Sequence, residues 1–447
     1  DMCDTIVILP EATSDKTTLF GKNSDRDPNE AHHLLSIPAS DHLSGSSLKC
    51  TYIEIPQVSH TFAVLLAKPF WIWGAEMGVN EHGVAIGNEA VFARIPYQKE
   101  DGLIGMDFLR LALERSTTAR AAVTVITDLL ATYGQGGNCG FQHKFYYYNS
   151  FLIADAYDAW VLETADRHWV AKQVKDIYTI SNSYSIEKEW DITSPGVVDF
   201  AIEKGWCKNR EDFNFSRCFS DFTYSTFSYG ASRRCRTRNL LEANKGNITI
   251  ADVMNTLRDH GENNKDGWGP DKGITGATVC MHAGFGPIRV SQTTGSMVSH
   301  LHPQNPTHFF TATAAPCTSI FKPVWFNTNL PSTGTQPGGN YDQTSLFWKH
   351  EALHRATMRN YGELIKLYQK DRDELERRFI FEALNHSTQA LAERLKFSTQ
   401  CFTEARHAEA TWLKHITEAK EKTNRSWHHT LAWNTFNRQA KIDKGHL

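Results

Sequence analysis

The sequence has no continuous apolar run long enough to cross a membrane. A spanning helix needs about 20 apolar residues, and the best candidate, residues 62–73, is interrupted by Lys68 and Pro69. The start of the chain is acidic, with Asp1 and Asp4, where a secretory signal would carry positive charge followed by an apolar segment. We therefore expect a cytoplasmic protein with no membrane partner.

The sequence also has no strong excess of either charge. It contains 47 Lys and Arg against 50 Asp and Glu, for a net charge of −3. A nucleic-acid-binding domain usually shows a basic patch and a high pI, so we expect no nucleic-acid partner. A hydrophobic content of 40% in 447 residues is typical of a globular protein with a large core. A homo-oligomer is compatible with this composition.

Cysteine spacings typical of zinc ribbons, redox motifs and disulfide frameworks are absent as well. The nine cysteines are an odd number and no pair has C-x-x-C spacing, which argues against a zinc ribbon, a redox motif or a disulfide framework. Among the 20 histidines, the adjacent pairs at 32–33 and 428–429 point in different directions on a helix or a strand. We expect reduced thiols, no metal and no cofactor.

The pattern of apolar residues predicts strands, then paired helices, then further strands, without regular strand–helix alternation. This order favours α+β layers over a doubly wound parallel sheet. A charged helical segment begins at about residue 345, and its charge run at 370–378 is typical of a solvated helix face. We divide the chain into residues 1–340 and a helical C-terminal extension, 341–447. The expected strands are 5–9, 17–21, 49–55, 61–66, 76–90 with a turn at 80–83, 150–155, 158–163, 169–173, 177–180, 275–282, 288–293 and 309–312, and the expected helices are 106–115, 118–133 and 248–260.

Cys3 lies almost at the start of the chain, directly before an apolar, β-like run. If the residues before it are removed, Cys3 carries both a thiol and a free α-amine. Such an amine has an ordinary pKa of about 7.7–8 and can act as a general base near neutral pH. A thiol with a pKa of about 8.5 needs only modest help to become a thiolate. Taken alone, a cysteine here is more often a small buried residue beside a strand.

In the sequence as written, the α-amine belongs to Asp1 and not to Cys3. Two extra residues displace that amine by up to about 7 Å along an extended chain, too far to take a proton directly from Sγ. We therefore expect the form that retains Asp1 to be inactive and a form that begins at Cys3 to be active.

Polar side chains lie where predicted strands end. Lys22, Asp25 and Arg26 follow the second strand, and antiparallel pairing with the first strand brings this segment near Cys3. Asp25 can accept a hydrogen bond from the α-ammonium, and Lys22 or Arg26 can favour a thiolate. Asn88 ends another strand and offers an amide that suits an oxyanion. The ordinary alternative for each cluster is a polar turn.

Several motifs in order along the chain together resemble the secernins. These are CDT at 3–5, LFGKNSDR at 19–26, GVNEHGVA at 78–85, SNS at 181–183, TVCMH at 278–282, QTTGSM at 292–297, AAPC at 314–317, FKPV at 321–324 and LFWKHE at 346–351. The secernins belong with the dipeptidase A-type cysteine peptidases of the N-terminal nucleophile (Ntn) hydrolase superfamily. The resemblance implies a four-layer αββα sandwich, with an N-terminal cysteine that attacks an amide carbonyl and uses its own amine as base.

More remotely, the chain is similar to penicillin V acylase and bile-salt hydrolase. By position, this similarity implies a catalytic site made of Cys3, Lys22, Asp25, Asn88, Asn182 and Arg233. It makes the two asparagines oxyanion or orienting groups. Lys22 replaces an arginine of those relatives and lacks the planar fork of a guanidinium. Arg234 is one residue away from Arg233 and stays open as the arginine of the site.

Two hypotheses about function follow. The first is an amide or peptide hydrolase with a cysteine nucleophile, most simply a dipeptidase or small-peptide hydrolase that needs no external cofactor. The second is a catalytically silent, secernin-like regulatory or interaction protein, since a fold does not guarantee catalysis. In that case the charged C-terminal helices would bind partners. A papain-like protease fits poorly because the signature around its cysteine is absent.

Overall fold

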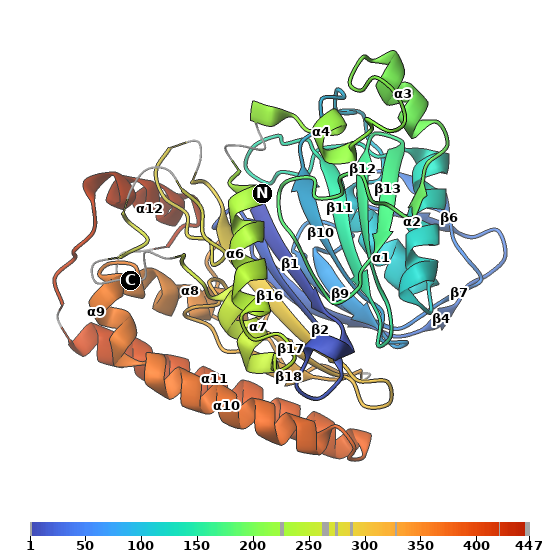
Figure 1. Cartoon of the computed structure of the whole chain (residues 1–447). Coiled ribbons are helices and arrows are strands. Elements are labelled where there is room, and N and C mark those ends of the chain that lie inside the picture. Colours follow the sequence, from blue (N-terminus) through green and yellow to red (C-terminus); the bar gives the residue numbers. More distant parts are fainter. Residues whose placement is uncertain are drawn as a thin grey trace.

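Two antiparallel sheets lie face to face in the computed structural model, which describes residues 2–223, 228–261, 268–272, 276–286, 289–326, 329–419 and 421–442 (Figure 1). In spatial order, the six-stranded sheet consists of β14 (Ile177–Ile180), β1 (Met2–Ile8), β2 (Thr18–Arg26), β16 (Gln292–Leu301), β17 (Thr307–Phe310) and β18 (Lys322–Val324). The eight-stranded sheet consists of β15 (Ile192–Thr193), β13 (His168–Gln173), β12 (Ala159–Ala165), β11 (Tyr148–Ala154), β10 (Ala85–Val91), β9 (Met77–Asn80), β8 (Val64–Pro69) and β3 (His32–Ile37). Two short ribbons pair β4 (Ser40–Asp41) with β7 (His60–Thr61) and β5 (Ser47–Lys49) with β6 (Glu54–Pro56).

Helices cover the outer face of each sheet. On the eight-stranded sheet, α1 (Gly105–Arg115) and α2 (Ala119–Tyr133) close one apolar core, and Thr118 caps the start of α2. On the six-stranded sheet, α6 (Gly230–Glu242) and α7 (Ile250–Leu257) pack beside the C-terminal helices around a second core. A third core fills the space between the sheets. These four layers confirm the predicted αββα sandwich.

Strand β1 shows why the sequence folds this way. Ile6 and Ile8 belong to the core under the helices, whereas Val7 belongs to the core between the sheets, as expected for side chains that alternate across a strand. Both faces are covered, so every residue of the strand is buried. The same alternation directs the side chain of Cys3 between the sheets and that of Asp4 toward the helices.

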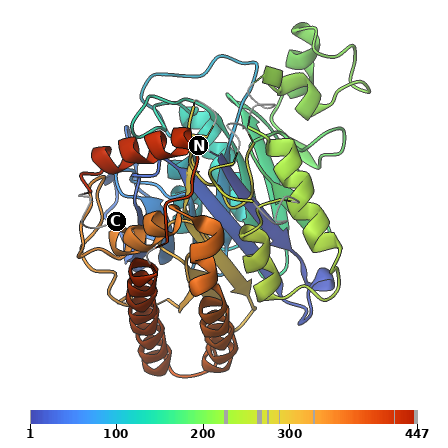
Figure 2. The ribbon, with the colours of Figure 1, turned by 90° about the vertical axis from the view of Figure 1, so that its left-hand side faces the viewer.

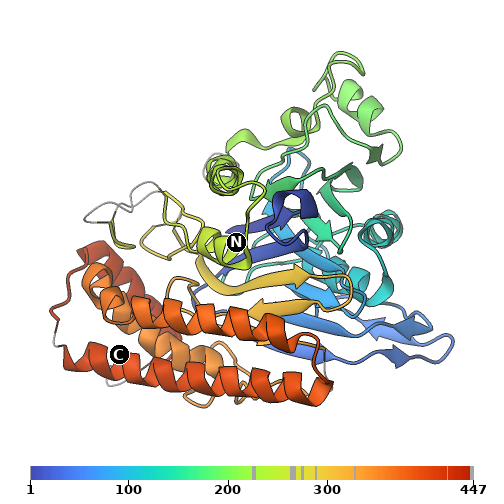
Figure 3. The ribbon, with the colours of Figure 1, turned by 60° about the horizontal axis from the view of Figure 1, so that its bottom comes forward.

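The C-terminal helices pack directly on the six-stranded sheet. They are α8 (Leu346–Thr357), α9 (Tyr361–Leu364), η2 (Ile365–Leu367), α10 (Gln369–His386), α11 (Leu391–Glu418) and α12 (Trp427–Gln439). Figures 2 and 3 show α10 and α11 side by side along one face of the molecule. Both contact β18, and Phe379 and Cys401 share one core with Ile8. The division of the chain at residue 340 stays a prediction.

Several sequence-based expectations differ from the structure, among them the predicted strand 288–293, of which only residues 292 and 293 belong to a strand, β16. The predicted strand 49–55 is instead the turn region of the β5–β6 hairpin. Residues 276–282 form no strand, because side chains of Asn23, Gln292 and Thr293 take the backbone hydrogen bonds there; residues 275, 287 and 288 lie outside the described part. The charge run of α10 is not fully solvated, since Arg372 and Glu376 are buried.

The remaining short elements are η1 (Pro10–Ala12) between β1 and β2, and α3 (Val197–Glu203) and α4 (Phe215–Phe219) at the edge of the eight-stranded sheet. None of the helices in the described ranges combines the length and the apolar character needed to span a bilayer.

Candidate active site

Cys3 is the second residue of β1 and is only 2% exposed. Its sulfur accepts a hydrogen bond from the backbone N–H of Asp25 at 3.4 Å and lies 3.9 Å from Oε2 of Glu76. The register of β1 and β2 pairs Cys3 with Ser24 and Met2 with Asp25. Met2 is therefore a buried strand residue directly beside the thiol.

Asn182 holds the backbone nitrogen of Cys3. It follows the end of β14, and its Oδ1 accepts a hydrogen bond from the Cys3 N–H at 2.8 Å. The Nδ2 group of Asn182 donates to the carbonyl oxygen of Ala90 at 2.9 Å. The sequence predicted an oxyanion or orienting role for Asn182. The observed contacts orient the main chain of Cys3, and one of the two hydrogens on Nδ2 bonds to a main-chain carbonyl.

Arg233 reaches the same point from α6. Its guanidinium donates to Oδ1 of Asn182 at 2.5 Å and to the carbonyl oxygen of Cys3 at 3.1 Å, and it pairs with Asp4. Arg234 points elsewhere and donates to the carbonyl oxygen of Thr179 at 2.8 Å. The structure thus brings Arg233, and not Arg234, into contact with Cys3.

Glycine at position 230 allows this approach of α6. A Cβ atom there would lie 2.7 Å from the main-chain carbon of Asn182, closer than packed atoms tolerate. The start of α6 can therefore lie directly against the segment that presents Asn182, and its first turn then delivers Arg233 to the end of β1.

Asp25 lies on the helix-facing side of the hairpin. Its Oδ1 accepts a hydrogen bond from Oγ1 of Thr293 at 2.6 Å, and its Oδ2 is 4.0 Å from the guanidinium of Arg233. Burial raises the pKa of Asp25 well above its ordinary value, although Arg233 counteracts this.

The expected hydrogen bond from the amine of Cys3 to Asp25 is not present in this chain. The nitrogen of Cys3 belongs to a peptide bond after Met2, so it has one hydrogen to donate, and Asn182 accepts it. Among the described residues, Oδ2 of Asp25 has no hydrogen-bond donor.

Lys22 lies between the sheets, on the same face of the hairpin as the thiol. Its Nζ donates to the carbonyl oxygen of Asn88 and lies 3.5 Å from Oε2 of Glu89 and 3.8 Å from Oε2 of Glu76. Burial opposes its charge, but Cys3, Glu89 and Glu76 together raise the pKa of Lys22. Lys22 is thus a buried cation on the face of the β1–β2 hairpin that carries the Cys3 thiol.

In the chain that retains Met2, the surroundings of Cys3 favour the thiol over the thiolate. Burial raises the pKa of Cys3 well above its ordinary value, Lys22 acts in the opposite direction, and Glu89 and Glu76 raise it further. Burial also raises the pKa of Glu89 to about 8, which Lys22 only partly offsets. The chain with Met2 in place therefore holds a protonated thiol at neutral pH.

Asn88 lies in β10, opposite the hairpin. Its Nδ2 donates to Oδ1 of Asn149 at 3.2 Å and lies 3.5 Å from the sulfur of Met106. No hydrogen bond joins its side chain to Cys3. Within the described part of the chain, Oδ1 of Asn88 is buried without a hydrogen-bond partner.

Sequence reasoning missed Glu76 and Thr293 as neighbours of the site. Glu76 also accepts a hydrogen bond from Arg26 at 3.1 Å, and Arg26 pairs with Glu30 at 2.6 Å. Nothing in the sequence around Glu76 signals that it lies near Cys3, because the packing of one sheet on the other brings the two residues together. Thr293 did lie in one of the motifs that carried the resemblance, although no role was assigned to it.

The described residues also include one group of side chains close enough together to hold a metal ion. It consists of His260, Cys280, His282 and Cys317, and none of the predicted catalytic residues belongs to it. The expectation of no metal site rested on spacing along the chain, whereas this cluster is assembled from three separate segments.

Comparison with known proteins identifies the family. The model of a family described as Peptidase family C69 matches residues 2–374. The chain belongs to peptidase family C69. Members of this family act on amide or peptide bonds, so the protein is a hydrolase and an enzyme, as the first hypothesis predicted. The narrower resemblance to the secernins stays a prediction.

Individual relatives of this C69 protein are distant. A protein named "Probable dipeptidase" from Salmonella dublin is 21% identical over 415 residues, which cover 80% of this chain and 89% of the relative. A mutant of the conjugated bile acid hydrolase from Clostridium perfringens is 14% identical, with a TM-score of 0.44 over 75% of this chain and 94% of the other. Penicillin V acylase from Agrobacterium tumefaciens is 13% identical, with a TM-score of 0.40 over 72% of this chain and 86% of the other.

Proposed function

We propose that this peptidase is a dipeptidase, or a hydrolase of similarly small peptides, with Cys3 as its nucleophile. The observation that carries the proposal is the placement of Cys3. Its nitrogen is held by Asn182 at 2.8 Å, its carbonyl oxygen by Arg233 at 3.1 Å, and its sulfur lies beside Lys22 among buried charges. The name of the relative from Salmonella dublin supports a dipeptide as the substrate.

The proposal requires that Cys3 become the first residue. Met2 pairs with Asp25 and is buried, so its removal both frees the amine of Cys3 and opens space beside the thiol. The new ammonium would keep its hydrogen bond to Asn182 and have further hydrogens to donate to Asp25. An added positive charge next to the sulfur would also favour the thiolate.

The reaction then proceeds in two halves. The amine of Cys3 takes the Sγ proton, the sulfur forms a bond to the substrate carbonyl carbon, and the tetrahedral oxyanion collapses with cleavage of the carbon–nitrogen bond. The leaving nitrogen takes the proton from the amine. Water then attacks the thioester, releases the acid product and restores the thiol.

The other site residues take positioning and electrostatic roles in this proposal. Asn182 and Arg233 hold the main chain of Cys3, Asp25 orients its ammonium, and Lys22 stabilises the thiolate. Asn88 and Asn182 are the two candidate side-chain donors to the oxyanion, and in the chain that retains Met2 each already donates to a neighbour, Asn88 to Asn149 and Asn182 to Ala90.

The test compares two forms of the full chain, one that begins at Cys3 and one that retains Met2, each confirmed by intact mass. We expect the Cys3-first form to hydrolyse dipeptides, and the Met2 form to be slower by roughly 10²–10⁴-fold, the range of acid–base losses. In the Cys3-first form, Cys3→Ala should abolish turnover, whereas Cys401→Ala, at another buried cysteine, should not.

Equal turnover by the Met2 form, with its mass unchanged after the assay, would contradict this mechanism. An inactive Cys3-first form, folded and tested on a broad dipeptide panel, would instead favour the catalytically silent alternative.

The remaining expectations concern location and partners. A cytoplasmic location is supported by free cysteines, since all nine are unpaired. The absence of a nucleic-acid partner and the formation of a homo-oligomer stay predictions, and light scattering on the purified chain would decide the second.

A further inference from the structure

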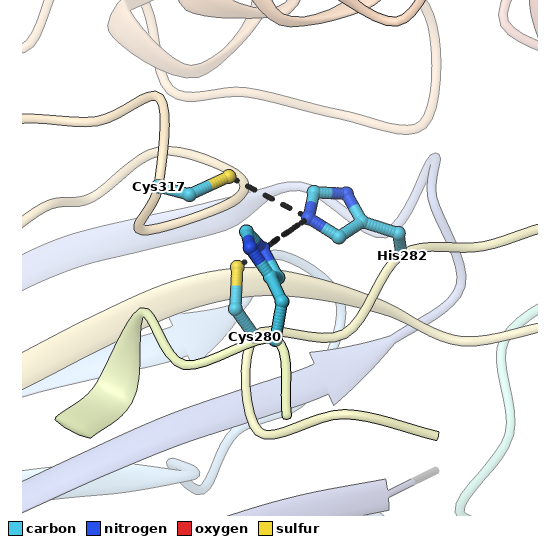
Figure 4. A group of neighbouring side chains, drawn as sticks. Cys280, His282 and Cys317 are labelled. Carbon is cyan, nitrogen blue, oxygen red and sulfur yellow. Dashed lines mark hydrogen bonds between the residues drawn. The ribbon is translucent and has the colours of Figure 1, made fainter. Parts of the chain in front are cut away.

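Four metal-ligating side chains from three separate segments meet beside the six-stranded sheet. His260 follows the end of α7, Cys280 and His282 lie in the segment before β16, and Cys317 lies between β17 and β18. All four are buried, and their ligand atoms lie within 4.8 Å of one another. Figure 4 shows the sulfurs of Cys280 and Cys317 pointing toward the ring of His282.

The contacts converge on a single nitrogen. Nε2 of His282 lies 3.5 Å from Sγ of Cys280, 3.5 Å from Sγ of Cys317 and 3.1 Å from Nε2 of His260. One imidazole nitrogen either donates or accepts a single hydrogen bond, so hydrogen bonding cannot satisfy three such neighbours at once. A cation shared by the four side chains can.

The distances also match a known coordination geometry. Tetrahedral zinc with Zn–S of about 2.3 Å and Zn–N of about 2.0–2.1 Å requires sulfur–nitrogen separations of about 3.6 Å and a nitrogen–nitrogen separation of about 3.3 Å. The observed separations are 3.5 Å for both sulfur–nitrogen pairs and 3.1 Å for the nitrogen–nitrogen pair. The three separations that share Nε2 of His282 are therefore those expected around a tetrahedral zinc ion.

We propose that His260, Cys280, His282 and Cys317 bind a structural zinc ion. Two thiolates and two imidazoles form a ligand set that zinc prefers. Four protein ligands leave no open position for water or substrate, which is the arrangement of structural and not catalytic zinc.

Neighbouring groups hold the ligands in place. The ring of His260 stacks on Trp268, with centroids 4.1 Å apart and planes 18° apart, and Tyr361 packs edge-on against it. The backbone N–H of Cys280 donates to the carbonyl oxygen of Asp259 at 3.0 Å, which ties the two ligand segments together. Such support around the ligands is typical of metal sites.

The proposed zinc site is connected to the β1–β2 hairpin through a short chain of hydrogen bonds. Met281, between two of the ligands, donates its N–H to Oγ1 of Thr293 at 2.9 Å and accepts from the Thr293 N–H at 3.0 Å. The same hydroxyl donates to Oδ1 of Asp25 at 2.6 Å. The ion thus fixes the segment that positions Asp25, a consequence that rests on the proposed function, whereas metal binding itself does not.

The decisive measurement is the metal content of the full chain, purified without a metal-affinity tag and dialysed against zinc. We expect about one zinc ion per chain. Cobalt exchanged into the site should show thiolate-to-cobalt charge-transfer absorption and the ligand-field bands of a tetrahedral ion. Cys280→Ser and Cys317→Ser should each lose most of the bound metal and the cobalt spectrum, whereas Cys401→Ser, at a buried cysteine outside the cluster, should keep both.

The wild-type chain keeps the test decisive if a ligand variant fails to fold. A strong chelator should remove the ion and lower the melting temperature, and added zinc should restore both. Less than about a tenth of an ion per chain after zinc dialysis would overturn the proposal, as would full metal content in a folded Cys280→Ser variant. A disulfide between Cys280 and Cys317, seen as the loss of a pair of hydrogens in the intact mass, would also overturn it. Zinc binding without any activity would leave the site in place and count only against the proposed catalysis.

Discussion

The buried ionisable groups around Cys3 include an acceptor for one more positive group. In the described part of the site, carboxyl groups outnumber cations. The carboxyl groups are those of Asp4, Asp25, Glu30, Glu76 and Glu89, and the cations are Lys22, Arg26 and Arg233. A free ammonium at Cys3 would reduce this imbalance and supply a donor for Oδ2 of Asp25, which has none among the described residues.

Replacing Asp25 by Asn in the Cys3-first chain should lower kcat for a dipeptide by roughly 10²–10⁴-fold. The amide keeps the volume of the side chain but loses the negative charge that would orient the ammonium. Steady-state kinetics measure the effect, and Asp41→Asn, at an exposed carboxylate, is the control. Turnover within about tenfold of wild type would show that Asp25 does not orient the amine.

At the residue scale, sequence reasoning works best for groups on the β1–β2 hairpin. Lys22 and Asp25 could be placed near Cys3 because antiparallel strands joined by a short connection must pair. The choice between Arg233 and Arg234 could not be made from sequence, since it depends on where α6 begins and how it rotates against Asn182. Glu76 gave no signal, because it approaches the thiol only through packing of one sheet on the other.

At the element scale, apolar periodicity predicted most strands and both helices on the eight-stranded sheet. It failed where side chains replace the backbone as hydrogen-bond partners. Residues 276–282 look like a strand, but Asn23 and Gln292 bond to their main chain, and the segment presents Cys280 and His282 to the metal cluster. A sequence pattern for strands carries no information about such competition.

Buried ion pairs within helix α8 hold Arg355, which bonds to the segment just beyond β2. Glu351 accepts hydrogen bonds from Nε of Arg355 at 2.6 Å and Nδ1 of His354 at 2.9 Å, and Arg355 also donates to Oδ1 of Asn29, just beyond β2, at 2.8 Å. Burial acts against the ionised carboxylate, but Arg355 and His354 lower the pKa of Glu351 to about 2. The charge of Glu351 therefore stabilises the docked helix.

The pH dependence of this contribution has a definite sign. The folded pKa of about 2 lies below the unfolded value of about 4.3, so the stabilisation is fully present above pH 4.3 or so and is lost as the pH falls toward 2. Glu351→Gln should lower the free energy of unfolding at pH 7 by about 3 kcal/mol. Urea unfolding at a series of pH values should show that the difference in the free energy of unfolding between wild type and Glu351→Gln shrinks in acid. The control is Glu363→Gln, at an exposed pair with Lys366, which should change the free energy of unfolding little. A difference that is constant from neutral pH to about pH 3 would contradict the assignment.

At the scale of the whole molecule, the C-terminal helices could be predicted but their packing could not. Their charge run suggested a solvated extension, yet Glu376 in α10 forms a buried pair with Arg258, at 2.6 Å, and accepts a hydrogen bond from the N–H of Phe321 at 2.9 Å. The metal cluster was missed for a similar reason, because its ligands come from segments far apart in the sequence. Burial and long-range assembly both depend on which surfaces meet, and composition does not encode that directly.

Two phenylalanines of α10 test whether these helices belong to the sandwich. Phe379 is fully buried in the core shared with β1 and α7, whereas Phe381 is 68% exposed. Phe379→Ala should lower the free energy of unfolding by about 3–5 kcal/mol, the usual loss for a buried aromatic side chain, and Phe381→Ala should change it by less than about 0.5 kcal/mol.

Because Phe379 shares its core with the strand that carries Cys3, the Phe379→Ala variant should still unfold in one transition, monitored by tryptophan fluorescence and circular dichroism together. Its kcat per folded enzyme should stay near that of wild type, since no described residue beyond 345 hydrogen-bonds to Cys3. Two separate transitions, with the loss confined to the first, would mean that residues 341–447 fold as a domain of their own.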